Sequence, residues 1–161
     1  MTRSQAALVA ALALVMGLAS CGAPEPDGPP RLRLGQDECV ECGMIISDDR
    51  FAAAREIVES RGRRVEVFDD LGCLFDREHS MPEVRATRAW VGNHAGGGWV
   101  PLESAVLVAS DEMHTPMGFG VAAYTSSAEA VKAAERLKGS IIDQAAARER
   151  RAAQSLRRTD G

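Results

Sequence analysis

The sequence of 161 residues lacks several features that would place it in common classes of protein. Only 4% of its residues are aromatic and its formal charge is -4, and it has no basic patch with interleaved aromatics, so we exclude nucleic acid as a partner. A C-x-x-C pair is present at Cys39 and Cys42, but no second pair and no H-x3-H motif completes a zinc finger. The longest apolar run, residues 6–19, is too short to span a membrane as a helix.

That short apolar run has the form of an export signal. Arg3 precedes it, as the positive n-region precedes the h-region of a secretion signal. The stretch LASC ends at Cys21 and resembles the lipobox of bacterial lipoproteins, in which the cysteine is lipidated and becomes the first residue. An ordinary cleaved signal with a chance cysteine is the alternative. We expect a lipoprotein signal at residues 1–20 and a lipid anchor at Cys21, on the periplasmic or extracytoplasmic face of a bacterial membrane.

Composition divides the rest of the chain into three segments. Residues 21–36 are rich in proline and glycine and predict a flexible linker behind the lipidated N-terminus. Residues 37–143 have the length of a compact domain, and a hydrophobic content of 45% over the whole chain allows a core. Residues 144–161 are rich in Ala, Arg and Gln without a sustained apolar stripe, so we expect a polar, basic tail that is a frayed helix or disordered, with a solvated face.

The domain has the hydrophobic periodicity of an α+β fold with two similar halves. In the first half, Val65 and Val67 alternate with polar residues, as in a half-buried strand, after a hairpin turn at residues 59–63. A helix follows, with Asp69 as its cap and Asp70 in its first turn. The apolar face of this helix consists of Leu71, Leu74 and Phe75.

The second half repeats this pattern. A glycine-rich loop at residues 92–99 separates the first two predicted strands, and Ser126 and Glu129 form a capping box at the start of the predicted helix. Each half therefore has two strands, a helix and a further strand, which suggests a duplicated unit. The predicted strands of this half are residues 89–91, 105–109, 121–124 and 140–143.

The cysteines restrict the chemistry most. In an oxidising compartment, Cys39 and Cys42 favour a disulfide, although their spacing also suits a metal ion or a redox pair. Cys73 lies in the first turn of the predicted helix, among Leu71 and Leu74, and we expect it to be a buried small hydrophobic side chain.

Soft donor atoms also gather elsewhere in the chain. Met44 follows the cysteine pair, and Met113, His114 and Met117 fall in a stretch rich in Pro and Gly that predicts a turn. Thiolates and thioethers select Cu(I), and imidazole also suits copper. For a single methionine, core filling is the usual alternative. Together these donors predict a copper site.

Four motifs closely resemble those of the NosL lipoproteins, in order and in spacing: CVECGMIIS at residues 39–47, FDDLGCL at 68–74, WVPLESAVLV at 99–108 and TPMGFGVAAY at 115–124. The resemblance implies two related ββαβ units, similar in topology to parts of organomercurial lyase. It also implies a Cu(I)-binding chaperone that serves nitrous oxide reductase, or another cuproprotein client, together with an ABC-type membrane complex.

By this resemblance, Met117 is the first choice of copper ligand. Cys42, Met44 and His114 come next, and Cys39 and Met113 complete the candidate set. Asp48 is a weaker candidate, since an exposed acid is its expected role. The chain departs from the NosL pattern at residues 100–102, where Val, Pro and Leu stand in place of an expected acidic residue after the second tryptophan.

The function predicted from the sequence is copper transfer by ligand exchange, without catalysis. Two alternatives remain. One is an interaction lipoprotein with a structural disulfide between Cys39 and Cys42 and no metal. The other is an enzyme, either a thiol oxidoreductase or a lyase, although Gly43 and Met44 do not begin a helix as an oxidoreductase motif usually does.

Overall fold

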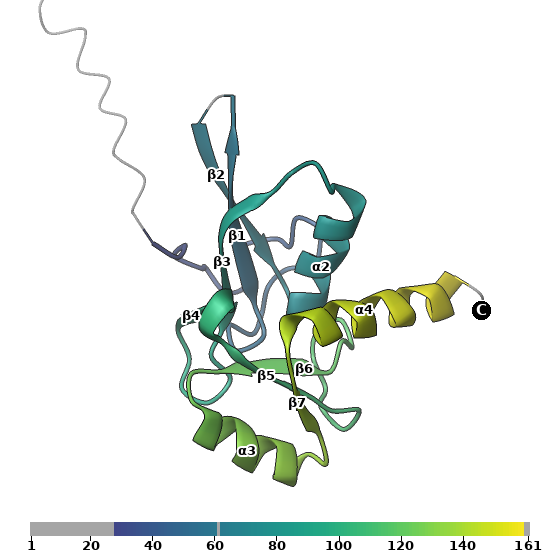
Figure 1. The fold of residues 1–161 in the computed structure, drawn as a ribbon. Coiled ribbons are helices and arrows are strands. Elements are labelled where there is room, and N and C mark those ends of the chain that lie inside the picture. The colour runs from purple at the N-terminus through teal and green to yellow at the C-terminus, as the bar shows by residue number, and fades with distance from the viewer. Residues whose placement is uncertain (1–27, 61, 160–161) are drawn as a thin grey trace, which may run out of the picture.

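The computed structural model describes residues 28–60 and 62–159. Within them the strands form two antiparallel sheets, which Figure 1 shows one above the other. The first sheet has the order β2-β1-β3-β4 and the second β6-β5-β7. The strands are β1 (Ala53–Glu59), β2 (Gly62–Phe68), β3 (Ala86–Gly92), β4 (Trp99–Pro101), β5 (Val106–Ala109), β6 (Val121–Tyr124) and β7 (Ser140–Ile142).

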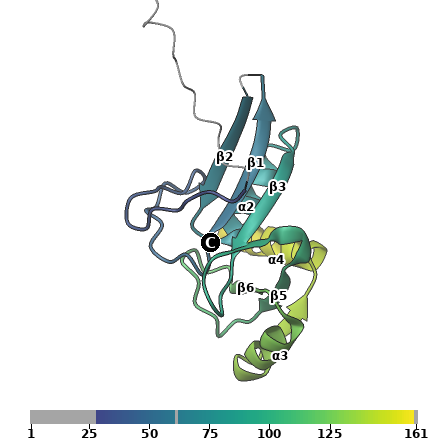
Figure 2. The ribbon, with the colours of Figure 1, turned by 90° about the vertical axis from the view of Figure 1, so that its left-hand side faces the viewer.

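The two predicted ββαβ units are confirmed, but residues 89–91, which we placed in the second half, belong to β3 of the first unit. In the first unit, helix α2 (Leu71–Ser80) connects β2 to β3; in the second, α3 (Ser127–Arg136) connects β6 to β7. In both units the first strand is central and pairs antiparallel with the second and the last. The strand β4 adds an edge to the first sheet, and the short helix η1 (Leu102–Ser104) leads into β5. Figure 2 shows α2 covering one face of the first sheet.

The helix starts agree with the predictions in one unit and correct them in the other. Ser126 caps α3 and exchanges hydrogen bonds with Glu129, as the capping box predicted. The cap of α2 is Asp70 and not Asp69, because Asp70 is the extended residue directly before the helix and its side chain accepts from the Cys73 N–H. Asp70 therefore lies outside the helical turn in which we had expected it.

The main core lies between the two units. It joins Phe68 and Leu74 of the first unit to Leu107 of the second, along with Phe119 from the loop before β6. A bridge between Asn93 and Ala123 also links the units through their backbones. The N-terminal part of α2, which contributes Leu74 to this core, therefore lies between the two units.

Residues 28–36, which we predicted as part of a linker, contact the domain. The Leu32 side chain packs against the main core. The Trp99 indole N–H donates to the Pro30 carbonyl at 2.9 Å, and the Gly35 N–H donates to the Ile46 carbonyl at the same distance. The packed part of the chain therefore begins before residue 37. The predicted signal, residues 1–20, and the predicted lipid site, Cys21, lie outside the described residues.

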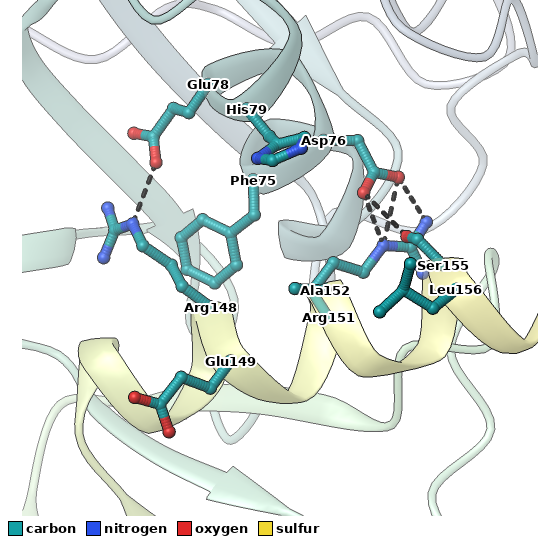
Figure 3. Close-up of a pocket in the computed structure, with 10 residues that line it drawn as sticks. All are labelled: Phe75, Asp76, Glu78, His79, Arg148, Glu149, Arg151, Ala152, Ser155 and Leu156. Carbon is teal, nitrogen blue, oxygen red and sulfur yellow. Dashed lines mark hydrogen bonds and ion pairs between the residues drawn. The ribbon is translucent and has the colours of Figure 1, made fainter.

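The predicted basic tail forms a helix, α4 (Gln144–Thr159), that packs beside α2. Its inner face is buried at Ala147 and Arg151, so the expectation of a solvated segment is wrong for these residues. Figure 3 shows Arg151 paired with Asp76 and Arg148 paired with Glu78. The hydropathy pattern missed this face because arginine buries its aliphatic stem while its head pairs with a carboxylate.

A search for membrane-spanning helices among the described residues finds none that is long and apolar enough.

Candidate metal centre

Three thiols come together where the first unit meets the loop that precedes it. The sulfur atoms of Cys39, Cys42 and Cys73 all lie within 4.8 Å of one another, and all three cysteines are free. Cys39 and Cys73 are buried, whereas Cys42 is half-buried. Cys73 is buried as predicted, but it is a member of the cluster and not only a small hydrophobic side chain.

A tight turn holds the first two thiols in place. The Cys39 N–H donates to the Met44 carbonyl at 2.8 Å, and the Gly43 N–H donates to the Cys39 carbonyl at 2.9 Å. Gly43 has a φ of 73°, a left-handed conformation that glycine adopts without strain. The turn is fastened to β2 by a hydrogen bond from the Val40 N–H to the Val67 carbonyl at 3.1 Å. The C-x-x-C pair therefore lies in a turn. This agrees with the prediction that Gly43 and Met44 do not begin a helix.

The third thiol comes from the first turn of α2. Cys73 is the third residue of this helix, which begins directly after β2. Because the turn of residues 39–44 is bonded to the end of β2, it meets the start of α2. No spacing rule connects Cys73 with a C-x-x-C pair more than thirty residues earlier, so the sequence alone did not indicate the third member. The nearest signal was its position at a helix N-terminus shortly after a half-buried strand.

The thiols differ in their protonation. A hydrogen bond donated by the Cys73 thiol lowers the pKa of Cys39 to about 5, assisted by backbone N–H groups that point at its sulfur. The same hydrogen bond, together with burial, raises the pKa of Cys73. Burial also raises the pKa of Cys42. The Cys73 hydrogen bond therefore favours the thiolate form of Cys39 in the metal-free cluster.

A buried carboxyl group lies close to this thiolate. Asp69 is 4% exposed, and one of its oxygens has no hydrogen-bond partner among the described residues. Burial first, and then the negative charge of Cys39, raise the pKa of Asp69 to about 6. A positive ion bound at the thiols would reduce this unfavourable negative charge.

The turn that carries Met117 is bonded to the same end of α2. The Thr115 hydroxyl and the Met117 N–H donate to one oxygen of Asp70, at 3.0 and 3.1 Å. Met117 is partly buried and packs against the core cluster that contains Cys39 and Cys73. The structure thus connects the first-choice ligand to the helix start that supplies the third thiol.

The other candidate ligands lie in different environments. Met44 is 57% exposed, beside the cysteine turn. Met113 is buried in a second core cluster with Val108 and Tyr124, separate from the cluster that contains the thiols, so it fills the core there. His114 is exposed, and its Nδ1 lies 3.2 Å from the Glu112 carbonyl oxygen.

Asp48, the weaker candidate, forms an ion pair with Arg50 at 2.6 Å. A groove of about 620 Å³ between α2 and α4, shown in Figure 3, is lined by Phe75, Arg148 and their neighbours and includes none of the three thiols. Neither feature belongs to the cluster.

Comparison with known proteins is consistent with this description. No family model and no curated protein matches the chain. Among solved structures, the crystal structure of the copper chaperone NosL from Shewanella denitrificans is similar, with a TM-score of 0.61. The two sequences are 18% identical, and the match covers 74% of this chain and 94% of that one. The chain therefore has a NosL-like α+β fold, as its motifs predicted.

Proposed function

We propose that this protein is a lipid-anchored, extracytoplasmic metallochaperone that binds Cu(I) and passes it to a cuproprotein by ligand exchange. A NosL-like fold and a cluster of three cysteines both fit copper binding. The observation that carries the proposal is the cluster itself, three thiols within 4.8 Å of one another.

The chemistry of the donors favours Cu(I) over hard ions. Thiolates are soft ligands, and no carboxylate or imidazole among the described residues joins Cys39, Cys42 and Cys73 in the group. Calcium and magnesium require oxygen ligands, which the group lacks. Met117 adds a thioether that needs no deprotonation. Binding would displace protons from the thiols, as metal binding to thiols generally does.

The uneven burial of the donors suits transfer. Cys39 and Cys73 are buried and would hold the ion, whereas Cys42 is half-buried and Met44 is exposed beside it. A donor from a partner can approach the ion on the side of Cys42 and enter the coordination shell before the buried thiols leave. Copper would then move between proteins without release as a free ion.

The partners follow from the motifs and the predicted anchor. The resemblance to NosL lipoproteins favours nitrous oxide reductase as the client and an ABC-type membrane complex as the site of delivery. Lipid at Cys21 would hold the protein at the membrane and raise its effective concentration near such partners. In this scheme the protein catalyses no reaction.

Copper titration tests the proposal. Reduced mature protein should bind a single Cu(I) ion in competition with a chelator. Met117→Ala and Cys42→Ser should each weaken binding by about tenfold or more, since even outer-shell changes at metal sites reach this size. Met81→Ala is the matched control, because Met81 follows the far end of α2, about 12 Å along the helix axis from Cys73.

Two results would contradict the proposal. Reduced protein that binds no Cu(I) has no copper site. Protein isolated from the periplasm with a permanent disulfide between Cys39 and Cys42, and without copper uptake, would favour the structural alternative in place of the chaperone.

A further inference from the structure

We propose that Asp70 is a positioning residue that fixes the Met117 turn to the start of α2 and so sets the thioether ligand beside the thiols. This inference rests on the proposed Cu(I) site and adds to it a residue that touches no metal. It assigns a role to a buried carboxylate that capping alone does not explain.

The Asp70 side chain makes three hydrogen bonds with both of its oxygens. Oδ1 accepts from the Cys73 N–H at 3.1 Å, which caps the helix. Oδ2 accepts from the Thr115 hydroxyl at 3.0 Å and from the Met117 N–H at 3.1 Å. Asp70 is fully buried, so water does not compete for these bonds. One carboxylate therefore joins the residue that supplies the third thiol to the residue that supplies the thioether.

The second ββαβ unit shows what capping alone requires. At the equivalent helix start, Ser126 caps α3 with a single hydroxyl, and the bonds that it makes stay within its own helix turn. A serine suffices there because, among the described residues, its side chain bonds only to Glu129. A carboxylate has several acceptor sites on two oxygens, so it can cap a helix with one and bind a second segment with the other.

Close packing of side-chain atoms against Gly72 supports the attachment. A Cβ added at Gly72, the second residue of α2, would lie 3.0 Å from the Phe119 Cβ and 3.0 Å from Asp70 Oδ1. The segment of residues 115–119 therefore lies directly on the first turn of α2. Thr115 strengthens this contact, because its hydroxyl also accepts from the Phe119 N–H at 2.9 Å.

The consequence for the metal site is that the Met117 thioether has less conformational freedom. The Met117 backbone is held by Asp70, while its side chain is partly buried against the main core, which includes Cys39 and Cys73. A ligand held in this way loses less conformational freedom on binding copper than one on a free loop. Loss of the Asp70 bond would leave the thiols in place and release the thioether.

The experiment compares variants that release the turn with variants that keep it. Thr115→Val removes the hydroxyl at nearly constant volume, and Thr115→Ser retains it. Asp70→Asn keeps an oxygen for the Cys73 N–H but presents an NH2 group where Oδ2 accepts two bonds. Ser126→Ala is the matched control, since it removes the corresponding cap of α3 and no bond to the turn.

Two quantities are measured for each variant, namely amide hydrogen exchange at Met117 and Phe119 in the reduced, metal-free protein, and Cu(I) affinity. We expect Thr115→Val and Asp70→Asn to speed exchange at Met117 by about tenfold or more. We expect them to weaken Cu(I) binding by about 10- to 100-fold. Thr115→Ser should restore both values, and Ser126→Ala should leave the Cu(I) affinity unchanged.

A Met117→Ala background makes the test specific. If Asp70 and Thr115 act through the thioether, Thr115→Val should cause no further loss of affinity once Met117 is absent. An equal loss in both backgrounds, or none in the wild-type background, would overturn the positioning role. If the protein binds no Cu(I) but Thr115→Val still speeds exchange at Met117, the copper function fails while the attachment of the turn stands.

Discussion

At the scale of single residues, Cys73 has one property that the sequence predicts and another that depends on the fold. Its burial follows from its leucine neighbours, and the structure confirms it. Its membership of the thiol cluster depends on the Val40–Val67 hydrogen bond, which brings a distant turn to the helix start. Asp69 and Asp70 show the same contrast, since either is a plausible cap in sequence and only the backbone geometry at Asp70 decides.

The role of Cys73 gives a direct prediction. Cys73→Ala keeps a small apolar side chain in the core but removes the third sulfur. If the side chain only filled space, Cu(I) affinity would be unchanged. We expect it to fall by about tenfold or more, measured by chelator competition on the reduced protein. Thermal unfolding of the metal-free variant is the control, since a large loss of stability would point to packing in place of ligation.

His94 gives a prediction of pH dependence. Burial first, and then the nearby charge of Arg50, lower the pKa of His94 below its ordinary value of 6.5. The unfolded chain therefore binds more protons than the folded chain between the lowered pKa and 6.5, so stability falls as the pH drops below 6.5. Urea unfolding of wild type and His94→Gln from about pH 5 to pH 8 should show a steeper loss in the wild type.

The difference between these two curves isolates His94. The pKa of Asp69 is raised to about 6, so its effect on folding stability has the opposite sign. The stability that Asp69 contributes is lost as the pH rises towards that value. Asp69 is present in both proteins and cancels from the difference. Parallel curves for the two proteins would contradict the lowered pKa of His94.

At the scale of elements, the predicted helices and strands are right where apolar residues recur at a regular spacing. They are wrong where the buried surface is not apolar. The strand β2 follows from the alternation of Val65 and Val67 with polar residues, and the helix α3 follows from its capping box. The three-residue strand β4 is too short for a period to be visible. Helix α4 buries Ala147 and Arg151, which hydropathy does not recognise as a core face.

The packing of α4 gives a prediction about stability. Arg151 is 4% exposed and donates to Asp76 at 2.9 Å, with its guanidinium 5.8 Å from the Phe119 ring centroid. Arg151→Ala leaves the half-buried Asp76 without this partner, and we expect a loss of about 1–3 kcal/mol. The exposed Arg157, changed to Ala, should alter the free energy of unfolding by less than about 0.5 kcal/mol. Equal effects in urea unfolding would show that α4 is not fastened through Arg151.

At the scale of the whole molecule, two units of the same topology carry unequal chemistry. The third residue of α2 is Cys73, whereas the third residue of α3 is Glu129, which completes a capping box. The first unit is also preceded by the cysteine turn, and β5 is preceded by the helix η1 with no cysteine. The repeated fold therefore supplies two similar frames, of which the first holds the thiols.

This asymmetry predicts the copper stoichiometry. A single site, made by the thiols of the first unit and its cysteine turn together with the Met117 turn of the second unit, should bind one Cu(I) ion per chain, measured as metal content after equilibrium dialysis of reduced protein. Glu129→Ala should leave that ratio unchanged, and a change of Cys39 and Cys42 to Ser together should abolish it. Removal of residues 1–27 should not alter the affinity, because the three thiols and Met117 all lie in the described domain. Binding of two Cu(I) ions per chain that persists when Cys39 and Cys42 are both changed to Ser would place copper in the second unit. That result would contradict the division of roles between the halves.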